Sequence, residues 1–398
     1  MFPVFKLRGT YGLVGNEQIG SADDRFYYLS QVNMETNARG VVFGRDLNHS
    51  IGGVEISRYA NDNIGWEIAY KSNIGVEASI GRDFSIIADF FNERRTNILI
   101  DRIIPAAMGL NAGVKANLGE AKSHGIDAEL NYQRSFGKDW WITGRGSFTY
   151  AKGTVSVWEE PDYTTTPWVS RVNRPIGQVW GLIAERLFVD DYEVNNSPTQ
   201  FGEYMAGDIK YRDVNGDGKI SDLDYVPIGH PTIPEINYGF GASIGFRSWD
   251  VSMFFQGSAR QSFWIDSYRT APFINTMSGV IGSNALLQAY ADSYWSESNR
   301  DPYALWPRLS NTNVSNNNRT NTWFMQDATF IRLKSAELGY TLPKSLSDQL
   351  KMSNFRVYVS GLNLLSFSGF KLWDPEMAGN GLGYPVQRVF NLGLNVNF

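Results

Sequence analysis

The sequence lacks several features that would each point to a familiar class of protein. It has no cysteine, which excludes disulfides, zinc–thiolate sites and cysteine nucleophiles. Its 41 acidic residues outnumber 36 basic ones and no basic cluster occurs, so nucleic acid is not an expected partner. No apolar run approaches the ~20 residues that a transmembrane helix requires, so any membrane-spanning part must be built from strands.

The motifs of common enzymes are also missing. There is no nucleophile elbow, phosphate-binding glycine loop or zinc-protease motif, and the histidines His49, His124 and His230 are scattered. The carboxylate pair Glu159 and Glu160 is interpreted as solvated loop charge. We therefore expect no enzyme activity. The first residues show no signal-peptide pattern, which predicts either a cytosolic chain or a part of a longer protein.

What the sequence does contain is period-two alternation of apolar and polar residues. Residues 236–247 place Phe240 and Ile244 on one face and Ser243 on the other, and residues 140–150 and 355–360 alternate in the same way. About a dozen such strands occur between Val4 and Phe398. A strand that separates lipid from a wet interior has this pattern, although a strand of a soluble sandwich alternates too.

The links between strands distinguish these two interpretations. Short links at 81–83, 137–139 and 247–248 alternate with long ones at 101–122, 153–235, 260–327 and 366–386. All long links then lie at one end of the strands, as in outer-membrane barrels with short periplasmic turns and long extracellular loops. Within residues 331–340 the faces swap near Lys334 and Ser335, which predicts a β-bulge, and residues 345–350 predict a single helical turn.

The last nine residues alternate without interruption and end on an aromatic residue, Phe398. A terminal strand of this kind would be an exposed edge in water, whereas a barrel removes such an edge by closure. The pattern also resembles the C-terminal signal that barrel-assembly machinery recognises.

A family resemblance rests on the same region and on several others. NFRVYVSGLNLL at 354–365, WDPE at 373–376, YP at 384–385 and RVFNLGL at 388–394 occur in order after FIRLK at 330–334 and LGYTLP at 338–343. Together with LRGTYGLVGN at 7–16, GIDAEL at 125–130 and FFQG at 254–257, they resemble the SusC/RagA family of TonB-linked outer-membrane proteins of the Bacteroidota.

The resemblance implies an all-β fold, namely the antiparallel transmembrane β-barrel of a TonB-dependent transporter, which is 22-stranded. Residues 1–398 then form the C-terminal portion of that barrel with long extracellular loops, without a second domain, and with the plug domain absent. It also implies location in the cell outer membrane, contact with membrane lipid, a SusD-like surface lipoprotein as partner, and TonB as a partner through the missing N-terminal region. The implied function is import of an oligosaccharide or peptide.

An acidic loop at residues 213–224 has the ligand spacing of an EF-hand and predicts a structural calcium ion. Its glycine at the sixth position permits a sharp turn, but no clear helix flanks the loop and the twelfth residue is Asp instead of Glu. The expected ligands are Asp213, Asn215, Asp217, the backbone carbonyl of Lys219, Ser221 and Asp224. The alternative is an acidic turn without metal.

Aromatic residues in the link 260–327 are candidates for contact with the substrate or with the lid lipoprotein: Trp264, Tyr268, Trp295, Trp306 and Trp323. They lie beside an asparagine-rich run at 311–318. Over contact with a glycan substrate we favour the alternative that these residues pack the loops together or meet the lid. Trp66, Trp140 and Trp249, at strand ends, are instead interpreted as a girdle at the membrane interface.

Two further functions remain open at this point. A self-contained passive outer-membrane barrel would make this chain the whole protein and would need a signal peptide. A soluble calcium-dependent binding module would be a sandwich centred on the acidic loop, and it would dissolve without detergent.

Overall fold

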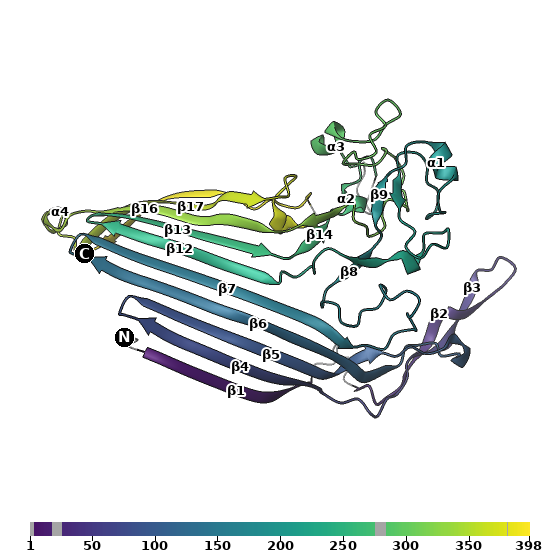
Figure 1. Ribbon diagram of the computed structural model, residues 1–398. Helices are drawn as coiled ribbons and strands as arrows, with labels where there is room; N and C mark the ends of the chain where they lie inside the picture. The colour runs from purple at the N-terminus through teal and green to yellow at the C-terminus, as the bar shows by residue number, and fades with distance from the viewer. Residues whose placement is uncertain (1–3, 18–25, 275–283, 380) are drawn as a thin grey trace.

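One antiparallel sheet of ten strands dominates the computed structural model, which describes residues 4–17, 26–274, 284–379 and 381–398 (Figure 1). In spatial order this wall comprises β1 (Val4–Asn16), β4 (Glu67–Ile80), β5 (Phe84–Asp101), β6 (Lys115–Phe136), β7 (Trp140–Val157), β12 (Ile236–Phe246), β13 (Trp249–Ala259), β16 (Phe330–Thr341), β17 (Asn354–Ser368) and β18 (Val389–Asn397). The predicted all-β antiparallel class is confirmed.

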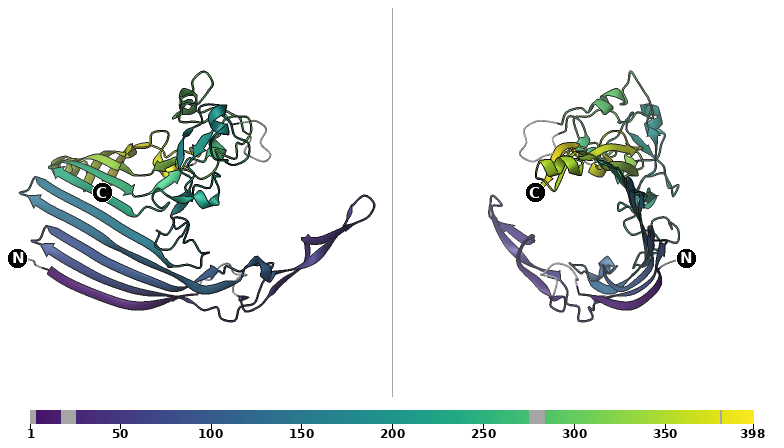
Figure 2. Two further views of the ribbon diagram at one scale, coloured as in Figure 1. Left: turned by 45° about the vertical axis from the view of Figure 1, so that its right-hand side comes forward. Right: turned by 90° about the vertical axis from the view of Figure 1, so that its left-hand side faces the viewer.

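The predicted dozen long strands divide into ten in the wall and two outside it. The two outside, β2 (Gln31–Phe43) and β3 (His49–Arg58), form a separate hairpin that projects from the loop end of the wall (Figure 1). The wall itself curves into an open arc (Figure 2). Among the described residues, β1 pairs only with β4 and β18 only with β17, so this wall does not close on itself.

The short links gather at one end of the wall, as predicted. Residues 81–83 connect β4 to β5, 137–139 connect β6 to β7, and 247–248 connect β12 to β13. Neighbouring turns are joined by hydrogen bonds, since the Arg247 N–H donates to the Asp139 carbonyl over 2.7 Å and the Thr341 N–H to the Ser248 carbonyl over 2.8 Å. The acidic loop lies at the opposite end, beyond β10 (Ile209–Tyr211) (Figure 1).

Two local irregularities also match the sequence. The pairing of β16 shifts between Leu333 and Ser335. Against β13, Lys334 is the extra residue of a β-bulge, whereas against β17 the two residues Asn363 and Leu364 lie opposite it. On the turn side, α4 (Lys344–Gln349) is the predicted helical turn between β16 and β17.

The long links fold together into a compact body that we call the loop lobe: the described residues of 158–235, 260–329 and 369–388. Its short strands are β8 (Val179–Gly181), β9 (Ala184–Leu187), β10, β11 (Val226–Ile228), β14 (Ser262–Trp264) and β15 (Met325–Asp327). Its helices are α1 (Asp191–Asn195), η3 (Asp222–Asp224), α2 (Ser267–Thr270), α3 (Gln288–Asp292) and η4 (Pro375–Met377), while η2 (Ala106–Met108) lies between β5 and β6. None of the helices described is long and apolar enough to cross a membrane.

The principal hydrophobic core lies in this lobe and not in the wall. Leu182, Leu187, Ile209 and Tyr211 are at most 1% exposed and pack with aromatic residues from the segment 260–329. A single-layer wall has no second layer to pack against, so the apolar side chains of the wall need a different environment.

Candidate functional site: the inner face of the wall and the loop lobe

Alternation gives the wall two chemically distinct faces. One continuous row of cross-strand neighbours is apolar and consists of Ile244, Val251, Leu338, Val359 and Leu392. The row beside it points to the other face and consists of Ser243, Ser252, Glu337, Ser360 and Asn391. We call these the outer and inner faces; the register confirms the predicted separation of Ile236, Phe240, Leu394 and Val396 from Arg145, Arg356 and Asn395.

The outer face would be unfavourable in water. Its side chains are strongly exposed, from 38% for Val251 to 76% for Leu392. Aromatic pairs lie at its turn end, where the rings of Trp140 and Phe246 are in tilted contact with centroids 4.2 Å apart and those of Trp249 and Tyr340 with centroids 4.7 Å apart. An apolar band bordered by aromatic residues is the lipid-facing surface of an outer-membrane barrel.

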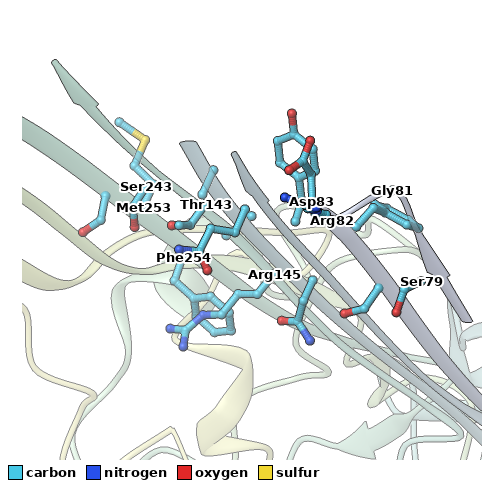
Figure 3. A pocket seen from close by; sticks show the side chains of 18 of the residues that line it. Ser79, Gly81, Arg82, Asp83, Thr143, Arg145, Ser243, Met253 and Phe254 are labelled. Atoms are coloured by element: carbon cyan, nitrogen blue, oxygen red, sulfur yellow. The ribbon is translucent and has the colours of Figure 1, made fainter. Parts of the chain in front are cut away.

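The inner face is hollowed and polar (Figure 3). A hollow of about 820 Å³ is lined by Ser79, Asn131, Thr143, Ser243, Ser252 and other residues of the wall. A second hollow of about 530 Å³ includes Asp89, Asp127 and Glu129. Arg145 and Phe254 border both, with the guanidinium carbon 4.8 Å from the ring centroid, and among the described residues Arg145 has no ion-pair partner.

Other arginines of the inner face are paired across an intervening strand. Arg356 on β17 reaches over Gly339 on β16 to Asp250 on β13, with 3.1 Å between Nε and Oδ1, and also meets Glu337 at 2.6 Å. Arg8 on β1 reaches over Gly75 on β4 to Asp89 on β5 in the same manner. A Cβ atom at Gly339 or Gly75 would lie 2.2 or 2.3 Å from the guanidinium, so each glycine leaves the gap that its arginine fills.

A further ion pair joins the loop lobe to the wall. Arg332 on β16 is 2% exposed, and its Nη2 lies 2.7 Å from Asp374 Oδ2 and 3.0 Å from Glu376 Oε2. Both acids belong to the WDPE motif, so two family motifs that are far apart in the sequence meet here. A buried arginine with two carboxylate partners holds residues 374–376 against the wall.

The acidic loop 213–224 closes on its own backbone. Asp213 accepts hydrogen bonds from the Gly216 and Gly218 N–H groups, at 2.7 and 2.8 Å. Asn215 accepts one from Asp217 N–H, and Asp217 one from Lys219 N–H. These bonds fold residues 213–219 into a turn that is held by its own side chains.

Asp224 closes the loop from its far end. It is fully buried and accepts hydrogen bonds from the N–H groups of Val214, Asn215 and Ser221. No cluster of three or more histidine, aspartate or glutamate side chains suited to a metal occurs in the described part of the chain. Calcium at this loop stays a prediction. The ion would be bound by those lone pairs of the carboxylate and amide oxygens that do not accept a backbone hydrogen bond.

The aromatic residues proposed for substrate or lid contact lie in different environments. Trp295 and Trp306 are only 6% exposed and belong to the lobe core. Trp264 and Trp323 are half-buried and donate hydrogen bonds to backbone carbonyls within the lobe. Tyr268 is exposed. Packing of the loops therefore accounts for Trp295 and Trp306, and ligand contact remains a prediction for the more accessible members.

The asparagine-rich run has a structural role that its composition did not reveal. Asn316 is fully buried and bonds to the Ile209 carbonyl, while Asn317 accepts from the Ile209 N–H and donates to Asp208. Asn321, also buried, donates to the Tyr211 hydroxyl. These side chains form hydrogen bonds with buried groups about 100 residues away in the sequence. A local sequence pattern does not indicate such distant pairings.

Glu193 is the centre of an ion cluster on the lobe. Burial tends to raise the pKa of its carboxyl, but hydrogen bonds from Lys210, from the Val189 N–H and from Arg186 outweigh burial and hold the pKa below its usual range. The Lys210 Nζ lies 2.8 Å and the Arg186 Nη2 lies 2.6 Å from Glu193 Oε1. The cluster ties α1 to β9 and β10.

No family model matches the chain. Two TonB-dependent receptors of Formosa agariphila, P3 and P26, are 24% and 26% identical over 99% and 100% of the chain, which spans about 40% of their length. The RagAB peptide transporter has the same fold, with a TM-score of 0.69 and 20% identity, covering the whole chain and 41% of the solved one.

The curved wall, its apolar outer face and these relatives define an outer-membrane β-barrel of the TonB-dependent class, as predicted. Within that class the chain is a homologue of TonB-dependent receptors of a Bacteroidota species, and the predicted resemblance to the SusC/RagA family is confirmed at the level of the fold.

Proposed function

We propose that this chain forms part of the wall of a SusC-like importer that takes up a large nutrient, a glycan or a peptide, through the outer membrane. The observation that carries the proposal is a pair of adjacent rows of side chains across β12, β13, β16, β17 and β18. One row is apolar and exposed, and the other is polar and borders the hollows. Such a wall separates lipid from an aqueous passage.

The proposed partners follow from the same architecture. A SusD-like surface lipoprotein would cover the loop lobe, since the lobe is the part of the chain that reaches beyond the loop end of the wall. TonB would act through a plug that fills the passage, and the unpaired Arg145 is a cation on the face toward that plug or a passing substrate. No residue of the described chain acts chemically in this proposal.

The two alternative functions fit the structure less well. A passive barrel made only of this chain would need β1 and β18 to meet, whereas among the described strands each has a single neighbour, at the two ends of an open arc. A soluble sandwich would need a second sheet over the apolar face, and the large described sheet is a single layer with that face exposed.

The absence of cysteine provides a direct test of the wall. Ser243→Cys and Ile244→Cys are neighbours on opposite faces, so a water-soluble maleimide should label the first and not the second in intact outer membranes. Equal labelling would contradict the lipid and water assignment. Import is tested separately: deletion of the gene, or an uncoupler that collapses the proton gradient, should abolish uptake of the nutrient, and unchanged uptake of every nutrient tested would refute the function.

Within this function we propose that residues 213–224 bind one structural calcium ion. What supports this proposal is that Asp213, Asn215 and Asp217 each accept hydrogen bonds from backbone N–H groups of this one turn. Calcium would stiffen the lobe and would have no catalytic role, because a fully ligated ion offers no open position.

A further inference from the structure

An aromatic hollow lies where the ends of β5 and β7 meet the loop lobe. It has a volume of about 470 Å³, within the range of small-ligand sites, and is open to solvent. Four half-buried aromatic side chains line it, and they are Trp158, Tyr163, Trp180 and Tyr225. None of them belongs to the aromatic set that the sequence indicated.

Contacts within the lobe orient Trp180 and the segment that carries Tyr225. The Trp180 indole N–H donates to the Trp168 carbonyl over 3.0 Å, and the Trp168 indole donates to the Leu223 carbonyl over 2.8 Å. Tyr225 follows directly on Asp224, the buried last residue of the acidic loop, and precedes β11, which pairs with β8 beside Trp180. The acidic loop thus positions one wall of the hollow.

The charged groups of the hollow are mostly paired with each other, with one exception. Arg102 Nε lies 2.7 Å from Glu159 Oε2, and Glu160 accepts hydrogen bonds of 2.6 Å from the Arg171 N–H and the Ser170 hydroxyl. The Arg171 guanidinium lies 5.9 Å from the Trp180 ring centroid and has no ion pair among the described residues. Its donors are therefore available to a ligand beside an aromatic surface.

We propose that this hollow binds a neutral oligosaccharide. Flat, rigid aromatic faces stack on the apolar faces of sugar rings, and the free donors of Arg171 with the Tyr163 hydroxyl suit sugar hydroxyl and ring oxygens. The inference rests on the proposed import function, because it names the class of substrate that the importer collects at its loop-side rim.

The charge balance and the shape select against other ligands. Asp101, Glu159 and Glu160 outnumber Arg102 and Arg171 by one charge, which disfavours an acidic sugar. A peptide that binds as an added strand needs a free strand edge. This hollow instead presents side chains from irregular segments and from β8, whose edge already pairs with β11.

The test uses the full chain, purified from outer membranes in detergent, on an array of neutral oligosaccharides with unblocked tetrapeptides alongside. The strongest sugar is then titrated by calorimetry. Trp158→Ala and Tyr163→Ala should each raise the Kd at least about tenfold, as expected for aromatic anchors. Tyr192→Ala, at an exposed tyrosine on α1 outside the hollow, is the matched control and should leave the Kd unchanged.

Folding of each variant is checked by its heat-dependent gel mobility. Tyr163→Phe keeps the aromatic ring and removes only the hydroxyl. If Tyr163→Phe raises the Kd less than Tyr163→Ala does, the result supports stacking of the ring on the sugar. The proposal is overturned if no neutral oligosaccharide binds, if the hollow variants bind like Tyr192→Ala, or if tetrapeptides compete for the hollow. Each of these results leaves the import function standing, since that function is judged by uptake in cells.

Discussion

Replacing Leu392 by arginine is the sharpest test of the two-faced wall. Leu392 lies in the middle of β18, at the end of the apolar row and opposite Val359. Its side chain is 76% exposed, so the substitution removes few protein contacts. Its effect therefore reports the surroundings of the outer face.

The expected cost is that of placing a guanidinium in the hydrocarbon layer, about 2 to 4 kcal/mol near the midplane. At about 1.4 kcal/mol for each factor of ten, the ratio of folded to unfolded protein should fall roughly 30-fold to several hundred-fold. Asn391→Arg is the matched control, because Asn391 is the next residue along the strand and faces Ser360 on the inner face. There the arginine remains in water, and we expect a change within about 0.5 kcal/mol.

The assay is equilibrium folding from urea into lipid vesicles, followed by the gel mobility of folded and unfolded protein. A second series in vesicles with thinner hydrocarbon should reduce the penalty of Leu392→Arg, because the guanidinium reaches an interface more easily. Equal stability of the two arginine variants, or a larger loss for Asn391→Arg, would show that the faces are assigned the wrong way round.

Three further outcomes are expected. Calorimetry should show calcium binding that Asp213→Ala combined with Asp217→Ala removes, and identical heats for wild type and double variant would refute the metal. Because the pKa of Glu193 is lowered in the folded lobe, its contribution to stability is complete above the unfolded pKa of about 4.3 and is lost as the pH falls through the lower folded pKa. Glu193→Gln should therefore flatten the pH dependence of the stability of the lobe over that acidic range, with unfolding followed by tryptophan fluorescence. A pH dependence equal to that of the wild type would count against the cluster. Gly339→Ala should displace the Arg356 guanidinium and destabilise the wall by about 1 to 3 kcal/mol in urea titration, and no loss would mean that the arginine reaches its partners by another path.

The wall was predictable from the sequence because lipid and water impose a simple rule on each strand. Alternation located the strands, and the order of short and long links fixed which turns share an end. The phase change at Lys334 even located a bulge. Each of these features depends on residues close together in the sequence, so no knowledge of distant contacts was required.

The loop lobe could not be predicted in the same way. Trp295 and Trp306 look like exposed binding residues in an irregular segment, but they fill a core built from three distant links. The asparagines at 316 and 317 serve the backbone of residue 209, and no local pattern indicates that pairing. The hollow around Trp158 and Trp180 also depends on segments that meet only after folding.

The bulge at Lys334 determines the position of one charge. Across it, Leu333 pairs with Phe255 of the outer face and Arg332 pairs with Gln256 of the inner face, whereas uninterrupted alternation from Leu338 would have turned Arg332 outward. One added residue therefore reverses the facing of everything between it and the loop end of the strand. Deleting Lys334 would pair Ser335 and Leu333 with consecutive residues of β13 and keep Arg332 on the inner face, whereas a strand that accommodated Lys334 without a bulge would turn the guanidinium of Arg332 toward lipid and away from Asp374 and Glu376. The bulge, and not the composition of the strand, therefore decides whether this ion pair can form.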